Sequence, residues 1–95
     1  MTTLHIEHSI VDFAVWSGAF ESFAEHRERA GVRGYRVLRP IDDPAYIMID
    51  LDFGTVEEAV GFLEFLTTRM WSSPATSPAL VGTPQTRILE TVATR

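Results

Sequence analysis

The 95-residue sequence predicts an α+β fold in which four antiparallel strands and two helices follow one another in the order βαββαβ. Apolar and polar residues alternate at 2–10 and again at 46–53, and a helical repeat of apolar residues follows each of these segments. The length and the hydrophobic content of 45% suit one globular domain, which we expect to span residues 1–95.

A strand and a helix are predicted first. The strand at residues 2–10 should bury one face, because its polarity alternates with a period of two. That face holds Leu4, Ile6 and His8. Asp12 is a suitable N-cap for the following helix, and Gly31 supplies the left-handed residue that ends it. The apolar stripe of this helix consists of Phe13, Trp16, Phe20, Phe23, Ala24 and Arg27.

Two further strands flank the turn "PIDDPAY", which is rich in aspartate and proline. The first of them spans about residues 35–39, and the second spans residues 46–53 and has the clearest alternation in the chain. One face of this third strand holds Ile47, Ile49, Leu51 and Phe53, and the other holds Tyr46, Met48, Asp50 and Asp52.

A second helix and a fourth strand complete the prediction. Thr55 and Glu58 form a capping-box pattern, which marks the start of the helix. Residues 72–85 are rich in Pro, Ser and Thr and should form a loop with a short turn near 78–81, followed by a strand at 86–92. The expected buried stripe of the helix is Val56, Ala59, Val60, Leu63, Leu66 and Met70, beside a side stripe of Phe62, Phe65 and Arg69. The expected helix-facing residues of the last strand are Ile88, Glu90 and Val92.

This order of elements in one small domain favours a ferredoxin-like sandwich, a four-stranded antiparallel sheet with both helices on one face. Because crossover connections are right-handed, the first and third strands should lie at the centre of the sheet.

The composition excludes several classes of function. A net charge of −5 argues against a nucleic-acid partner, because phosphate binding depends on clustered positive charge. Without cysteine there are no disulfides and no thiolate metal sites, and His5 and His8 point to opposite faces of their strand, so they do not form a metal pair.

Phosphate-loop, nucleophile-elbow, flavin and nicotinamide motifs are missing, and we expect neither a metal nor a cofactor. We expect a cytoplasmic protein that contacts no membrane, because neither a secretory signal nor an apolar run of membrane-spanning length occurs.

Two stretches resemble the dimeric α+β barrel superfamily, near antibiotic-biosynthesis monooxygenases and small polyketide cyclases. One is the spacing of Asp12–Phe13, Trp16, Phe20, Arg27 and Gly31, and the other is "DFGTVEEAVGFLEFL". The resemblance implies two subunits that pair sheet to sheet, each with a small-molecule cavity between helices and sheet. Haem-degrading relatives use an Asn, a Trp and a His of the second helix; this chain has Trp71 but no Asn, and no His in that helix.

One end of the predicted sandwich combines the features of a small-ligand pocket. His8 ends the first strand on the buried side, near four side chains expected to form walls, and the loop 72–85 should cross above. Histidine can carry a proton at neutral pH, so His8 is the candidate catalytic residue. The alternative is a core histidine bonded to a backbone carbonyl. The expected walls are Phe13, Trp16, Met70 and Trp71.

Arg27 is expected at the opposite end of the sandwich, where it interrupts an apolar stripe. A pair with Glu90 would make it structural, and the sequence favours this interpretation because buried charges usually have protein partners. The alternative is a ligand-binding role, in which the guanidinium holds a carboxylate or an enolate.

The helix-free face of the sheet is predicted to form a dimer interface, because it mixes apolar and ionic side chains. Asp50 and Asp52 share this face and should pair with Arg36 and Arg87. The apolar part of the contact should include Tyr46 and Met48, with Leu38 and Leu89 nearby.

Two functions follow from these features and from the resemblance. The first is a homodimer that binds an aromatic or polyketide-like metabolite and catalyses cofactor-free oxygenation or cyclisation. The second is a non-catalytic ligand-binding or structural dimer of the same fold. An open cavity beside His8 favours the first function, and close-packed aromatic side chains there favour the second.

Overall fold

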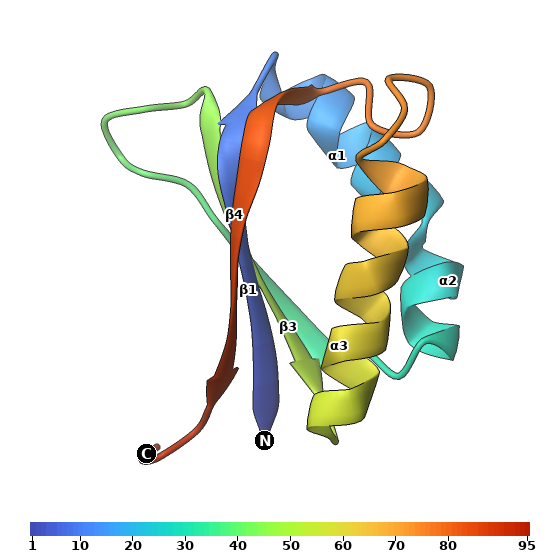
Figure 1. Ribbon diagram of the computed structural model, residues 1–95. Coiled ribbons are helices and arrows are strands. Elements are labelled where there is room, and N and C mark those ends of the chain that lie inside the picture. The colour runs from blue at the N-terminus through green and yellow to red at the C-terminus, as the bar shows by residue number, and fades with distance from the viewer.

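A four-stranded antiparallel sheet carries all the helices on one of its faces (Figure 1). The computed structural model describes all 95 residues. The order of the helices and strands confirms the predicted α+β, ferredoxin-like arrangement, and the first helix is divided into two pieces. The elements are β1 (Thr2–Ile10), α1 (Phe13–Ser22), α2 (Ala24–Arg29), β2 (Gly34–Leu38), β3 (Tyr46–Phe53), α3 (Val56–Phe65), the π-helical turn η1 (Leu66–Met70) and β4 (Leu80–Glu90).

The strands lie in the order β2-β3-β1-β4, so the first and third strands are central, as predicted. β1 pairs with β3 in a register that sets Leu4 opposite Leu51 and His8 opposite Ile47. Both strands alternate between buried and half-buried residues along their whole length, which confirms the predicted faces. The core therefore lies between this face and the helices, and its largest fully buried side chains are Phe53, Leu4, Ile47 and Leu51.

The segment between β1 and β2 is a broken helix. Asp12 caps α1, because its side chain accepts a hydrogen bond from the Val15 amide at 2.8 Å. At Phe23 the backbone leaves the helical conformation, and α2 begins at the next residue. Gly31 then ends the segment with a φ of +102°, the left-handed conformation that the sequence predicted for this glycine.

α3 begins at the predicted capping box, in which the Thr55 hydroxyl accepts from the Glu58 amide at 3.1 Å. The predicted buried stripe is wrong in part. Val56 and Val60 are 52% and 47% exposed, whereas Phe62, assigned to the side stripe, is buried. The helix is rotated so that its aromatic residues face the core, where an aromatic side chain buries more apolar area than a valine does.

β4 begins at Leu80, earlier than the predicted residue 86, and ends at Glu90. The extra residues pair with the end of β1 beyond an irregularity between Glu7 and Ser9, and Gly82 there has a φ of +76°. β4 is an edge strand, where Pro84 costs no ladder hydrogen bond. Of the predicted helix-facing residues, Ile88 is half-buried opposite Leu4, Glu90 is exposed, and Val92 lies outside the strand.

Candidate functional site

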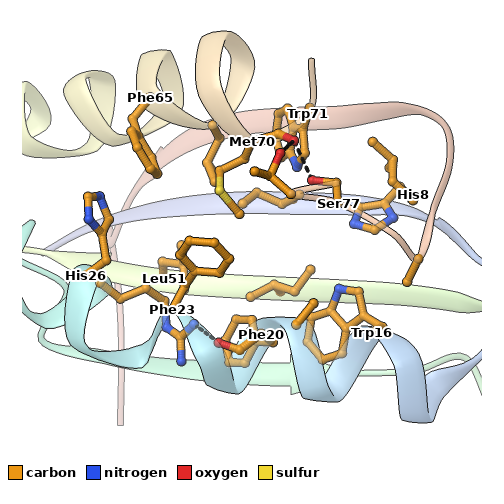
Figure 2. A pocket seen from close by; sticks show the side chains of 18 of the residues that line it. His8, Trp16, Phe20, Phe23, His26, Leu51, Phe65, Met70, Trp71 and Ser77 are labelled. Carbon is orange, nitrogen blue, oxygen red and sulfur yellow. Dashed lines mark hydrogen bonds between the residues drawn. The ribbon is translucent and has the colours of Figure 1, made fainter. Parts of the chain in front are cut away.

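A cavity of about 110 Å³ lies between the helices and the sheet, and its walls are mainly apolar (Figure 2). Fourteen of its twenty lining residues are hydrophobic. The cavity is close in size to the ~150 Å³ engineered cavity that binds benzene, so it has room for about one aromatic ring. His8, Trp16, Arg27, Met70 and Trp71 all contribute to its lining, so five of the six residues predicted for the site meet around one space.

His8 is buried at the end of β1, with its ring beside Ser77 and Trp16 (Figure 2). Its Nδ1 lies 2.9 Å from the Ser9 carbonyl oxygen. A carbonyl only accepts, so the neutral ring carries its proton on Nδ1, and Nε2 keeps a lone pair with no protein partner. Burial lowers the pKa of His8, and the hydrogen bond to Ser9 opposes this shift. The ring is therefore a neutral base in a mainly apolar cavity.

The walls differ in part from the prediction. Trp16 stacks on Phe20 with ring centroids 4.8 Å apart, and both side chains line the cavity. Phe13 does not: it is 41% exposed and packs against the outer side of Trp16. It sits at the first position of α1, one turn before Trp16, the first residue of this helix that lines the cavity. The lining residues not proposed for the site include five aromatic side chains, which are Phe20, Phe23, His26, Phe62 and Phe65.

The π-helical turn η1 brings Met70 and Trp71 to the cavity. The Trp71 amide donates to the Leu66 carbonyl at 2.8 Å, which is the i to i−5 spacing of a π turn. This turn leaves the Met70 carbonyl free to accept from the hydroxyls of Thr76 and Ser77, at 2.7 and 2.6 Å. The segment 71–79 is thereby tied over the same end of the sandwich as the start of α1 (Figure 1). The covering loop is thus shorter than the predicted 72–85.

Arg27 is 6% exposed and forms no ion pair, so the predicted pair with Glu90 is wrong. Its guanidinium donates to the Phe20 carbonyl and lies 3.6 Å above the Phe20 ring and 5.4 Å from that of Tyr35 on β2. β2 and β4 are opposite edges of the sheet, so an arginine above β2 cannot reach Glu90. Burial lowers the pKa of Arg27, and Coulombic interactions with Tyr35 and Glu21 oppose this shift. The same cavity reaches both this arginine and His8, which the sequence assigned to opposite ends.

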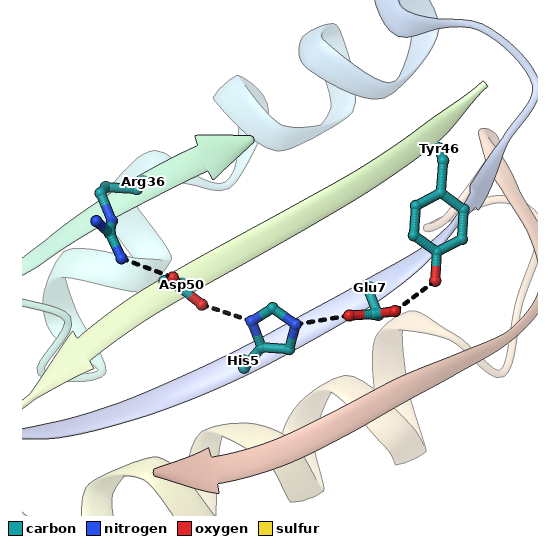
Figure 3. Close-up of polar contacts among 5 residues, drawn as sticks. All are labelled: His5, Glu7, Arg36, Tyr46 and Asp50. Atoms are coloured by element: carbon teal, nitrogen blue, oxygen red, sulfur yellow. Dashed lines mark hydrogen bonds and ion pairs between the residues drawn. The ribbon is translucent and has the colours of Figure 1, made fainter. Parts of the chain in front are cut away.

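The helix-free face of the sheet carries a continuous polar chain (Figure 3). His5 lies between two carboxylates, with Nδ1 2.6 Å from Asp50 and Nε2 2.8 Å from Glu7. Arg36 binds the other oxygen of Asp50 at 3.0 Å, and the Tyr46 hydroxyl donates to Glu7 at 2.7 Å. The hydrogen bond to Glu7 raises the pKa of His5, with a further contribution from Asp50. The hydrogen bond between His5 and Glu7 also lowers the pKa of Glu7. The hydrogen bond between Tyr46 and Glu7 raises the pKa of Tyr46.

The residues predicted for an interface all lie on this face. Arg36 and Asp50 form the expected pair, whereas Arg87 lies opposite His5 in the register and pairs with no carboxylate. Asp52 instead accepts from the Thr3 hydroxyl at 2.8 Å. His5 was not foreseen in this role, although its parity with Glu7 and Asp50 was the available signal. Apolar side chains left exposed on the face are Leu38, Val81 and Leu89.

No family model matches the chain, and no curated protein matches it in sequence. Several solved structures do match it in fold. SnoaB, a cofactor-independent oxygenase from Streptomyces nogalater, aligns over 98% of this chain and 94% of its own, with a TM-score of 0.70 and 17% identity. A dimeric ferredoxin-like protein from an uncultured marine organism aligns over 99% and 97%, with a TM-score of 0.71 and 10% identity. NE2512 of Nitrosomonas europaea, a protein of unknown function, aligns over 99% and 91%, with a TM-score of 0.74 and 13% identity.

Other matching structures are named antibiotic biosynthesis monooxygenases. The matches cover nearly the whole chain, so this domain has the ferredoxin-like fold that the predicted resemblance implied. At these identities the likeness is one of fold. Separately, none of the helices has the length and apolar character needed to cross a membrane.

Proposed function

We propose that this protein is a homodimer whose subunits each bind a small aromatic or polyketide-like metabolite and catalyse its cofactor-free oxygenation or cyclisation. The observation that carries the proposal is the state of His8: a buried, neutral imidazole whose unbonded Nε2 belongs to an apolar cavity. A base in such a place can remove a proton from a substrate that is bound in the cavity. The cofactor-independent oxygenase SnoaB has the same fold, which supports this choice of reaction.

The chemistry assigned to the chain is proton transfer. His8 Nε2 takes a proton from an acidic C–H or O–H of the substrate, which leaves an enolate or a phenolate. In an oxygenation, this electron-rich anion reacts with O₂, so that one oxygen atom enters the substrate and the other leaves as water. The substrate supplies the electrons, and no redox cofactor is required. The aromatic walls hold the ring and keep solvent away from the anion.

Pairing through the helix-free face completes the proposal. This face presents exposed Leu38 and Leu89 beside the His5 chain and an arginine, Arg87, that has no carboxylate partner. A second copy would cover the apolar side chains and bring carboxylates towards that arginine. The dimeric ferredoxin-like neighbour supports such pairing. Sedimentation at micromolar concentration tests it, and a monomer there would contradict it.

A non-catalytic ligand-binding or structural dimer is the second candidate. The small size of the cavity favours it, and so do the bonds that tie Thr76 and Ser77 to the Met70 carbonyl over one end. In this case His8 would only satisfy the Ser9 carbonyl within the core.

Oxygen uptake separates the two candidates. The purified protein is offered one- and two-ring phenols and 1,3-diketones, with O₂ consumption and product formation recorded. We expect His8→Gln to lower turnover by about 10²-fold or more, since general-base catalysis contributes ~10²–10⁴-fold. His5→Gln, on the other face, is the matched control and should retain turnover. Equal turnover in His8→Gln would remove the catalytic role, and binding without O₂ uptake by any compound would favour the second candidate.

A further inference from the structure

Arg27 is a buried cation that forms no ion pair. It is 6% exposed, and the ion pairs of the molecule involve other residues. A charge removed from water is costly unless an opposite charge or a full set of hydrogen bonds replaces the lost hydration. The arrangement around Arg27 supplies neither in full, which distinguishes it from Arg36, whose guanidinium meets Asp50 at 3.0 Å.

The contacts of the guanidinium leave most of its donors available. A guanidinium carries five N–H groups in a planar fork, and the Phe20 carbonyl is the one protein acceptor that Arg27 reaches. The ring faces of Phe20 and Tyr35 stabilise the charge but accept no conventional hydrogen bond. Glu21 acts on the charge through space, without a hydrogen bond to it. No fully buried side-chain nitrogen of the molecule lacks a partner, so the Arg27 nitrogens without a protein acceptor remain within reach of water or a ligand.

The surroundings of Arg27 determine what can complete it. The residue lines the same cavity as His8, among the aromatic rings of Phe20, Phe23 and Phe65. The cavity has room for about one aromatic ring. Arginine binds a carboxylate through two parallel hydrogen bonds, which suits a flat ligand that enters between rings.

We propose that Arg27 is the anion-binding residue of the cavity and that the natural ligand is a small aromatic carboxylate. Its carboxylate meets the guanidinium, and its ring lies against Trp16 and Phe20 and extends towards His8. This inference rests on the ligand-binding part of the proposed function and deepens it by naming the ligand class. It does not depend on catalysis, because the interaction is one of binding alone.

The wild-type protein by itself gives the first test. Benzoate and 2-naphthoate are titrated calorimetrically beside benzamide and 2-naphthamide, which have the same shape without the charge. We expect at least one carboxylate to bind tenfold or more tightly than its amide. A preference for the amides, or no binding by any of the four compounds, would overturn the proposal.

Matched variants give the second test. Arg27→Met should remove the preference for the carboxylate and leave the affinity for the amide within about twofold. Arg36→Met, which removes an arginine from the other face of the sheet, should keep the preference. If Arg27→Met does not fold, Arg27→Lys retains the charge without the fork and should weaken carboxylate binding by less than the full preference. An Arg27 variant that folds and binds carboxylates as the wild type does would refute the assignment.

The outcomes for binding and for catalysis are separable. A carboxylate preference without O₂ uptake supports Arg27 and rejects the catalytic proposal. Turnover that depends on His8, without any preference for anions, supports the catalytic proposal and rejects this one.

Discussion

The two faces of the sheet use the same types of side chain in opposite ways. On the helix-covered face, His8 and Arg27 are buried among aromatic residues and touch no carboxylate. On the helix-free face, His5 lies between Asp50 and Glu7, and Arg36 is paired with Asp50. The first face holds titratable groups whose protein partners are uncharged carbonyls, and the second face pairs its histidine and Arg36 with carboxylates.

This difference appears in the two histidines. Burial lowers the pKa of His8, whereas two carboxylates raise the pKa of His5. The first is a neutral base with a free lone pair, whereas the second donates from both ring nitrogens to carboxylates, which requires its charged form. A histidine with a neutral environment is suited to proton transfer, and one already bound to two carboxylates is suited to holding strands together. This contrast is why we assign the chemistry to His8.

The largest expected effect concerns packing. Phe53 is fully buried on the helix-covered side of β3, and Met48 is on the opposite side of the same strand. We expect Phe53→Ala to lower the free energy of unfolding by about 3–5 kcal/mol. Met48→Ala should cost less than about 1 kcal/mol in dilute protein, where no partner subunit covers it. Urea unfolding measures both, and similar costs for the two variants would mean that stability is shared evenly between the faces.

The second prediction concerns His8 and low pH. The pKa of His8 is lowered in the folded state, so below the unfolded value of about 6.5 the unfolded chain binds more protons. Stability should therefore fall as the pH drops below 6.5 and level off below the folded pKa. Protonation buries an unpaired charge, which costs about 1–3 kcal/mol. His8→Phe should abolish this part of the pH dependence in thermal unfolding followed from pH 7.5 to 4.5, and an unchanged profile would mean that His8 is solvated.

The features of this fold and site that the sequence predicted correctly are those that depend on neighbouring residues. Strand alternation placed Leu4, Ile6 and His8 on the buried face, and the caps at Asp12 and Thr55 marked both helix starts, because these signals need only neighbouring residues. The rotation of α3 was missed, since Val60 and Phe62 are both apolar and only packing against the sheet decides between them.

Partners distant in the chain were harder to predict. Glu90 has the correct parity to face Arg27, but the order of strands puts it at the far edge of the sheet. The hydrogen bonds through His5 were not predicted, because alternation gives the face on which His5 lies but not the register that sets it directly opposite Asp50. The early start of β4 depends on an irregularity in the pairing with β1, which sequence alternation does not reveal.

The third prediction uses His5 as the counterpart of His8. Its pKa is raised in the folded state, so its stabilising effect is complete below about pH 6.5 and is lost as the pH rises through the folded value. His5 is hydrogen-bonded to Glu7 and Asp50, and Tyr46 is hydrogen-bonded to Glu7. Arg87 lies opposite His5 on β4. We expect His5→Gln to cost about 1 kcal/mol at pH 6 and less at pH 9, because the ion pairs are only partly shielded from water. A cost that grows with pH would contradict the charged state assigned to His5.

The smallest expected effect distinguishes the two arginines. The Arg36 side chain is 72% exposed, so its pair with Asp50 is screened by water and salt. Arg36→Gln should change the stability of the dilute protein by less than about 0.5 kcal/mol, and 0.5 M NaCl should reduce even that difference. The same substitution should weaken self-association if the helix-free face pairs with a second copy, because Arg36 would then lie within a contact from which water is excluded. Sedimentation of Arg36→Gln beside wild-type protein checks this, and an unchanged association constant would place the contact elsewhere on the molecule.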